Sequence, residues 1–426
     1  MIIRGRVLHF LEQPDADNLD SSYEYIEEGA LIVNEGRILG VGDYSGIRKK
    51  YPDAEVMDHG NNLIFPGFID LHNHFPQVQV IGSYGTQLLE WLNKYTFPEE
   101  AKFWDKTYAK AQAKNFIKLL LCNGTTTSVS FCSVHKNSAS ALFEEASNHN
   151  MCMIAGKIMM DRNAPHNLID DPKASYEDTT ELILNWHKKG RNYYAISPRF
   201  AITSSPEQLL QAGRLVSENP TCYMQTHLAE NEEEIKYTMS LYPKSKHYLE
   251  IYQEFGLISD KSLLGHSIHL SSNEISVLKE LQAVAVHCPT SNMFLGSGFF
   301  QLDNLVKSGV KVGIASDVGG GTSYSMINNL DAAYKIQQFQ NFSVHPMYSF
   351  YWATLGNARA LGLDKEIGNF KKGSFADIVV LDTASDVCSE IRMKTCNSLT
   401  EELFVLQTLG GDRSVKAVYV AGKLLK

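Results

Sequence analysis

Short apolar runs alternate with longer segments of helical character through the middle of the chain. Each run is rich in β-branched and other apolar residues and is followed by a stretch that fits a helix. The eight runs are residues 68–71, 126–131, 151–158, 194–196, 222–227, 262–266, 283–287 and 311–315. Strands that alternate with helices are typical of a parallel sheet, and eight of them favour a closed barrel.

Both ends of the chain have the pattern of antiparallel strands. Two apolar runs within residues 30–42 flank a short turn that contains Gly36, which predicts a hairpin. Residues 376–382 predict a further strand, and residues 415–425 predict a second hairpin that turns at Ala421 and its neighbouring glycine. We therefore expect the two ends to pair with each other outside the barrel.

The length of the chain agrees with this plan. At 426 residues there is room for two or three domains, at roughly 150 residues each. We expect an α/β chain with a TIM-like (β/α)8 barrel at residues 66–359 and a small β-sandwich domain formed by residues 1–65 and 360–426. Residues 161–178 are rich in Asp, Asn and Pro, and they are interpreted either as a mobile lid or as an ordered loop.

Charge and composition narrow the classes of partner. The chain has 39 Lys and Arg against 48 Asp and Glu, a net charge of −9, and no long basic cluster. We therefore expect neither nucleic acid nor an anionic membrane surface as a partner. No apolar stretch approaches the ~20 residues that cross a bilayer, and no export signal is expected at the start. The seven cysteines include no C-x-x-C pair, which favours a reduced, cytoplasmic protein.

Several candidate metal ligands follow predicted barrel strands. His72 and His74 stand two residues apart on an extended run, so both side chains point to the same face. His227 ends a later strand, and Asp317 follows the last one. Because the carboxyl ends of barrel strands meet at one face, these four side chains are expected to converge. Three imidazoles and a carboxylate predict a catalytic site for one divalent metal, most simply Zn²⁺, with Fe²⁺ as the alternative.

Two further residues are expected at the same face. Glu230 follows His227 by three positions and is interpreted either as a proton shuttle beside a metal-bound water or as a solvated helix residue. His266 ends another strand and is either a fourth ligand or a hydrogen-bond partner of that water; we favour the second role. Structural roles are favoured for His269 and His287, although their roles stay open.

Taken together, these features resemble the amidohydrolase superfamily over nearly the whole chain. The resemblance rests on the strand ends at His227 and His266, on Asp317, and on residues 66–74 and 368–377. Within the superfamily, the chain is most similar to members that deaminate guanine. That likeness rests on residues 74–77, 88–98, 197–200, 287–292 and 317–326.

The resemblance implies an enzyme that hydrolyses the exocyclic amine of guanine, giving xanthine and ammonia, and that forms a homodimer. Arg199 suits this substrate, because its guanidinium can donate two hydrogen bonds to O6 and N7 of the purine. Gln77 offers both a donor and an acceptor to a mixed purine edge. Trp91 and Phe200 are interpreted either as apolar walls of the base pocket or as ordinary core residues.

The expected mechanism divides the work between the catalytic residues. Asp317 and His266 orient the water, and Asp317 accepts its proton as the oxygen attacks purine C2. Glu230 protonates ring nitrogen N3, so that negative charge does not accumulate on the ring.

Other functions stay open at the level of sequence. A related deaminase or chlorohydrolase would act on another nitrogen heterocycle, such as an adenosine derivative, cytosine or a triazine. A non-catalytic scaffold protein on the same barrel is also conceivable, but such a protein should have lost metal ligands. A binuclear hydrolase would need a modified lysine between two metals. Lys157 lies in an apolar run, but this alternative is disfavoured because a bridging lysine needs a strand-end position that faces the mouth of the barrel.

Overall fold

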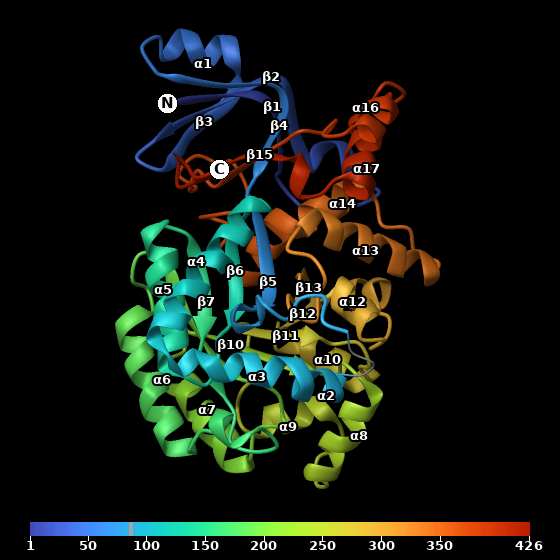
Figure 1. Ribbon diagram of the computed structural model, residues 1–426. Coiled ribbons are helices and arrows are strands. Elements are labelled where there is room, and N and C mark those ends of the chain that lie inside the picture. Colours follow the sequence, from blue (N-terminus) through green and yellow to red (C-terminus); the bar gives the residue numbers. More distant parts are fainter. Residues whose placement is uncertain (85–87) are drawn as a thin grey trace. The chain divides into compact units, whose positions relative to one another are not determined.

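The protein is described by a computed structural model that covers residues 1–84 and 88–426. The chain forms two compact units (Figure 1). The first contains both chain ends and consists of residues 1–70, 118–127 and 324–426. The second consists of residues 71–117 and 128–323. The domain boundaries expected from the sequence, residues 1–65, 66–359 and 360–426, separate the terminal β-strands from the barrel rather than two compact units. These domain boundaries stay a proposal.

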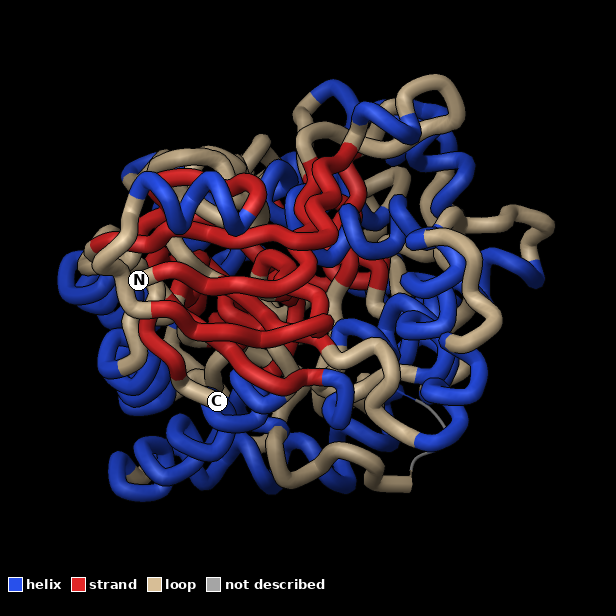
Figure 2. Tube along the Cα trace, turned by 90° about the horizontal axis from the view of Figure 1, so that it is seen from above, coloured by secondary structure: helices blue, strands red, loops and turns tan. Residues whose placement is uncertain are grey.

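The first unit is built on one seven-stranded sheet with the order β16-β15-β14-β4-β1-β2-β3 (Figure 2). Its strands are β1 (Ile2–Phe10), β2 (Tyr23–Asn34), β3 (Arg37–Asp43), β4 (Val56–Pro66), β14 (Ile378–Leu381), β15 (Val415–Val420) and β16 (Lys423–Leu424). β4 pairs with β1 in parallel and with β14 in antiparallel register. The predicted pairing of the two chain ends is therefore confirmed.

Both predicted hairpins are present in this sheet. Glu35 and Gly36 form the first turn with φ of 49° and 77°, and Ala421 and Gly422 form the second with φ of 45° and 75°. Two successive residues with positive φ match the right-handed twist of antiparallel strands. One face of the sheet buries an apolar cluster that includes Ile64 and residues of both hairpins, and the other face packs against α1 (Tyr44–Lys50).

Helices complete the first unit. They are η1 (Leu19–Ser21), α13 (Met326–Phe339), α14 (Pro346–Tyr351), η6 (Trp352–Gly356), α15 (Asn357–Leu361), α16 (Val387–Met393), α17 (Leu399–Leu409) and η7 (Asp412–Ser414). α13 and α17 pack against each other through Tyr334 and Phe404, whose rings lie 5.0 Å apart. This contact joins the helix that follows the last barrel strand in the sequence to the C-terminal segment.

The barrel strands run in the order β5-β6-β7-β9-β10-β11-β12-β13, and β8 pairs with β9 beside them. They are β5 (Phe68–His74), β6 (Thr125–Phe131), β7 (Cys152–Gly156), β8 (Ile158–Met159), β9 (Asn192–Pro198), β10 (Tyr223–Leu228), β11 (Ser262–His266), β12 (Val284–His287) and β13 (Lys311–Ile314). Every predicted run overlaps one of these strands, and the run at residues 151–158 spans β7 and the start of β8. The TIM-like barrel is therefore confirmed, and its core is almost wholly buried.

Helices surround these strands (Figure 1). They are η2 (Phe75–Gln77), α2 (Leu88–Trp91), η3 (Leu92–Thr96), α3 (Phe97–Glu100), η4 (Ala101–Trp104), α4 (Lys106–Cys122), α5 (Lys136–Asn148), η5 (His166–Leu168), α6 (Pro172–Trp186), α7 (Pro206–Glu218), α8 (Glu232–Leu241), α9 (Tyr248–Glu254), α10 (Ser272–Glu280), α11 (Pro289–Phe294) and α12 (Leu302–Ser308). The side chains of Ser205 and Ser271 cap α7 and α10 by accepting backbone amides. Such caps satisfy N–H groups that have no partner within the helix.

Residues 161–178 are anchored at several points, which favours an ordered segment over a lid. The ammonium of Lys157 forms a buried ion pair with Asp170 and donates to the Ser175 hydroxyl at 3.1 Å. The amide of Asp170 donates to the carbonyl of Met160 at 2.7 Å, and α6 begins at Pro172. Because its ammonium is committed to these bonds, Lys157 gives no support to a bridge between two metals.

Candidate active site

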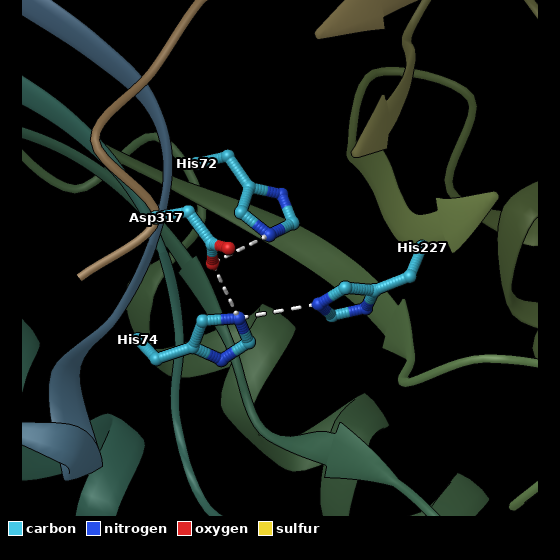
Figure 3. Close-up of side chains that lie close together, drawn as sticks. All are labelled: His72, His74, His227 and Asp317. Atoms are coloured by element: carbon cyan, nitrogen blue, oxygen red, sulfur yellow. Dashed lines mark hydrogen bonds and ion pairs between the residues drawn. The ribbon is translucent and has the colours of Figure 1, made fainter. Parts of the chain in front are cut away.

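Four side chains from three strand ends converge in the second unit (Figure 3). One oxygen of Asp317 lies 3.4 Å from Nε2 of His72 and 3.2 Å from Nε2 of His74. Nε2 of His227 lies 3.2 Å from Nε2 of His74. All four residues are buried, and their candidate ligand atoms lie within 4.8 Å of one another. The structure therefore brings together the four predicted ligands.

The backbone explains how these residues meet. His72 and His74 point to the same face because they stand two residues apart on β5, where successive side chains point to opposite sides. Asp317 adopts a left-handed conformation, with φ of 48°, directly after the last strand. Its amide donates a 2.8 Å hydrogen bond to the carbonyl of His72, and the amide of His74 donates to Val318 at 2.8 Å. These two bonds join β5 to the segment that follows β13, so they bring the two ends of the barrel sheet together at the ligands.

The donor set fits a divalent cation. Nδ1 of His227 lies 2.7 Å from the carbonyl of Arg199, so that nitrogen carries the hydrogen and Nε2 presents a lone pair toward His74. Burial lowers the pKa of His74 to about 4 and that of His227 well below its usual range, so both rings are neutral. Burial acts to raise the pKa of Asp317, but hydrogen bonds with His72 and His74 hold it well below its usual range. Neutral imidazoles around a carboxylate are the ligands of a divalent-metal site.

Glu230 lies beside this cluster. One carboxyl oxygen is 3.4 Å from Nε2 of His266, and the other accepts a 2.9 Å hydrogen bond from the Ser297 hydroxyl. Burial and the negative charge of Asp317 raise the pKa of Glu230 to about 8. A carboxyl group with such a pKa holds its proton near neutral pH and can give it to a substrate.

His266 faces both acidic groups. Its Nε2 lies 3.6 Å from Asp317, and its Nδ1 lies 2.9 Å from the side-chain oxygen of Asn292. That oxygen only accepts, so Nδ1 carries the hydrogen and Nε2 is left to face the centre of the site. The geometry suits the predicted contact with a water.

A single pocket joins the cluster to the predicted substrate residues. Its lining consists of His74, Gln77, Leu88, Trp91, Leu92, Arg199, Phe200, His227, Glu230, His266, Leu295, Asp317 and Gly320. The residues expected to read and enclose a purine thus share one cavity with the catalytic candidates. Trp91 and Phe200, for which core packing was the alternative, line this pocket and also belong to a buried apolar cluster. His269 and His287 are not among its lining residues in the described part of the chain.

Comparison with known proteins identifies the family. The model of the Amidohydrolase family matches residues 63–425. The chain belongs to this family. This amidohydrolase is 46% identical to guanine deaminase of Escherichia coli over 425 residues, which cover 99% of the chain and 97% of the relative.

Solved structures agree with the sequence comparison. The structure of E. coli guanine deaminase matches this amidohydrolase with a TM-score of 0.98 at 44% identity, covering 100% of the chain and 99% of the other. Guanine deaminase from C. acetobutylicum, solved with guanine bound in its active site, matches with a TM-score of 0.90 at 31% identity. That match covers 100% of the chain and 99% of the other.

The structure of this amidohydrolase reveals a positioning group that the sequence concealed. Glu230 lies in the segment just before α8. The carboxylate of Glu234 accepts hydrogen bonds from the backbone amides of Glu230 and Asn231 at 2.8 and 3.1 Å. It also accepts the hydroxyl of Tyr248 at 2.8 Å. Burial and the neighbouring Glu230 raise the pKa of Glu234 to about 7. The sequence conceals this role because Glu234 follows two other acidic residues, and a run of charged residues does not reveal which member is buried.

Asn292, Ser297 and Glu100 were also missed as functional candidates in this amidohydrolase. Asn292 and Ser297 hold His266 and Glu230, and Glu100 contacts both Gln77 and Arg199. Of these three residues, only Asn292 lies in a segment on which the family resemblance rests, residues 287–292. Ser297 and Glu100 had no signal in the sequence, because their partners are distant along the chain.

His269 and His287 of this amidohydrolase make contacts typical of structural residues. His287 stacks on Phe300 with ring centroids 4.5 Å apart, and burial lowers its pKa to about 3. Nε2 of His269 lies 2.8 Å from the carbonyl of Ser297. These contacts agree with the structural roles favoured for both residues.

Proposed function

We propose that the chain catalyses the hydrolytic deamination of guanine to xanthine and ammonia, a step of purine catabolism. The observation that carries the proposal is the shared pocket of Arg199, Gln77, Glu230 and the candidate metal ligands. It combines groups that can activate water, donate a proton and recognise a planar base. The guanine deaminases to which the chain is similar over nearly its full length support the same activity.

His72, His74, His227 and Asp317 would hold the metal, and we propose zinc as its identity. When bound there, a divalent cation would supply Lewis-acid chemistry that lowers the pKa of an adjacent water to about 7, so that water would lose a proton readily near neutral pH. The four buried donors and the lone pair that His227 directs toward His74 support this assignment.

Arg199 and Gln77 would recognise the base. The guanidinium of Arg199 donates to the purine carbonyl oxygen O6 and its neighbour N7, both of which are acceptors. Gln77 contributes a polar amide to the same pocket. Phe200 and Trp91 enclose the flat faces of the ring, where apolar contact replaces water.

Glu230, His266 and Asp317 would carry the proton transfers. Asp317 accepts a proton from the water, and His266 orients that water for attack on purine C2. Glu230 protonates N3, so the ring becomes neutral as the new carbon–oxygen bond forms. The amine at C2 takes the proton held by Asp317, and the C2 hydroxyl returns a proton to Glu230. The C2–nitrogen bond then breaks as the C2 carbonyl forms, which gives ammonia and xanthine.

Ammonia release tests this proposal directly. Purified, metal-loaded protein is incubated separately with guanine, adenine, cytosine and a triazine, and ammonia is measured for each. Release from guanine, with little from the other three compounds, is expected because the Arg199 and Gln77 pair matches the guanine edge. Turnover of another base without turnover of guanine would overturn the proposal.

A cytoplasmic location and a homodimer complete the proposed function. All seven cysteines lie in described parts of the chain and are free, which is typical of a reducing compartment. In the described residues, no helix has the length and apolar character needed to cross a bilayer. Light scattering in solution should give the mass of two chains, and a monomer mass would exclude the dimer.

A further inference from the structure

The carboxylate of Glu100 connects the two residues proposed to read the base. One of its oxygens accepts a 2.8 Å hydrogen bond from Nε2 of Gln77. The other accepts a 2.7 Å hydrogen bond from Nη1 of Arg199. The side chains of Glu100 and Arg199 are only 1% and 3% exposed, so water does not compete for these bonds. Glu100 is the last residue of α3, in a segment that follows the pocket residue Trp91.

This contact decides which way the amide of Gln77 faces. An ionised carboxylate only accepts hydrogen bonds, so Glu100 must face the NH₂ group of Gln77 rather than its oxygen. The oxygen, Oε1, is buried and has no hydrogen-bond partner in the described part of the protein. A Cβ at Gly319 would stand 2.6 Å from this oxygen, so a glycine at this position leaves room for it. Gln77 therefore offers an acceptor to a molecule in the pocket.

The same carboxylate fixes the guanidinium of Arg199. Nη1 is held by Glu100, and the guanidinium carbon lies 5.4 Å from the centre of the Phe97 ring. A planar group held at one edge and packed on one face keeps a defined orientation, and its other N–H groups stay available as donors. Arg199 thus presents a donor beside the acceptor of Gln77.

We propose that Glu100 is the positioning residue that sets the donor and acceptor pattern of the pocket. The matching ligand edge carries an N–H beside a carbonyl oxygen, as N1 and O6 of guanine do. This inference rests on the proposed function and deepens it, because it explains why Gln77, whose amide could face either way, presents its oxygen. Glu100 itself does not line the pocket among the described residues, so it acts through Gln77 and Arg199.

Glu100→Gln would invert part of this pattern. The new amide has only one accepting oxygen, and it cannot serve both Gln77 and Arg199 with unchanged geometry. If that oxygen stays with Arg199, its NH₂ group faces Gln77, which must then rotate to present its own oxygen to residue 100. The NH₂ group of Gln77 would enter the pocket, and the acceptor for a ring N–H would be lost.

The exchange variant Gln77→Glu with Glu100→Gln should repair the pattern. The amide at 100 accepts from Arg199 and donates to the carboxylate at 77. The second oxygen of that carboxylate then faces the pocket as an acceptor. Glu99→Gln is the matched control, because Glu99 precedes Glu100 on the same helix and contacts Lys102 and Tyr108 instead.

The test compares guanine with 2-aminopurine, which keeps the C2 amine but lacks both the N1–H and the O6 carbonyl. The KM and kcat for guanine, the inhibition constant of 2-aminopurine and the metal content are measured for each protein. Glu100→Gln should raise the KM for guanine about 10- to 100-fold, as expected for a site that loses a matched hydrogen bond. The inhibition constant of 2-aminopurine should stay the same or fall, because its N1 accepts a hydrogen bond and suits the NH₂ group that Gln77 would then present. Metal content should stay the same. The exchange variant should recover most of the lost preference for guanine.

Several results would overturn the inference while leaving the proposed function intact. One is a Glu100→Gln protein with wild-type turnover of guanine and an unchanged KM. Another is a Glu99→Gln protein whose KM for guanine rises as much as that of Glu100→Gln. If Glu100→Gln does not fold, Gln77→Glu alone is compared with the exchange variant. Recovery of the guanine KM in the exchange variant supports the inference, and no recovery contradicts it. A wild-type protein that releases no ammonia from guanine would instead remove the proposed function.

Discussion

The amide of Asp317 donates a 2.8 Å hydrogen bond to the carbonyl of His72, while the carboxylate of Asp317 approaches the His72 ring at 3.4 Å. The same two residues therefore meet twice, once through the backbone and once through the side chains. The backbone contact closes the barrel, and the side-chain contact forms part of the candidate metal centre. We therefore expect metal binding and barrel closure to be coupled through this pair.

Metal removal should therefore lower stability as well as activity. Dialysis against a chelator is expected to abolish ammonia release from guanine and to lower the melting temperature, and added Zn²⁺ should restore both. A ligand present at 100 times its Kd stabilises the folded state by about 2.7 kcal/mol. Thermal melts with metal analysis check this prediction. Apoprotein that melts at the same temperature as the loaded protein would contradict the coupling.

Glu230→Gln should retain metal and lose most turnover. The amide keeps the shape of the side chain but cannot donate an acidic proton to the ring. A loss of about 100- to 10,000-fold in kcat is expected for a general acid. Steady-state assays and metal analysis test this, with Glu233→Gln as the control, because the Glu233 side chain is 73% exposed and pairs with Lys236. Activity within a few-fold of wild type would remove Glu230 from the mechanism.

Arg199→Ala should weaken guanine binding without releasing metal. The side chain donates toward the base, whereas the backbone carbonyl of Arg199 orients His227 and survives the substitution. We expect the KM for guanine to rise about 10- to 100-fold. Kinetics on guanine and metal analysis distinguish these two roles. An unchanged KM would mean that the purine edge is recognised elsewhere.

Acid should weaken the ion pair between Arg6 and Glu402 in the first unit, where two bonds join the side chains. Burial acts to raise the pKa of Glu402, but the hydrogen bonds and charge of Arg6 lower it below the usual 4.5. A lowered carboxyl pKa contributes stability above the unfolded pKa, and this contribution is lost as pH falls through the folded pKa. Glu402→Gln should therefore reduce the free energy of unfolding by ~1 kcal/mol at neutral pH.

Urea unfolding of wild type and Glu402→Gln at about pH 7 and about pH 3 measures this difference. The difference in the free energy of unfolding between wild type and Glu402→Gln should be smaller at the lower pH. A gap that stays constant or widens in acid would show that the carboxylate does not contribute through its charge.

The barrel could be predicted from the sequence because its strands are buried on both faces. Residues 126–131 and 222–227, for example, are nearly continuous buried runs in the structure as well. His72, His74, His227 and Asp317 could be predicted for a related reason. Each is a metal-ligating residue type that directly ends or follows such a run, and barrel topology then brings them together.

Glu100 could not be predicted in the same way. It follows Pro98 in a segment of short α, π and 3₁₀ turns, where no apolar periodicity marks a buried face. An acidic residue early in a helix is ordinarily interpreted as a favourable partner of the helix dipole. Its importance comes from two partners, Gln77 and Arg199, that only the folded chain brings to it. Glu234 was hidden for the same reason.

The place of β4 between β1 and β14 bears on how the chain is made. During synthesis, β1 and β4 leave the ribosome long before Ile378–Leu381 exists, so one edge of β4 waits without its partner. An unpaired edge is a template for wrong strand pairing. A translation product that stops short of β14 would keep that edge open and offer it to proteases. The sheet of the first unit therefore covers this edge of β4 only in chains whose synthesis has reached β14.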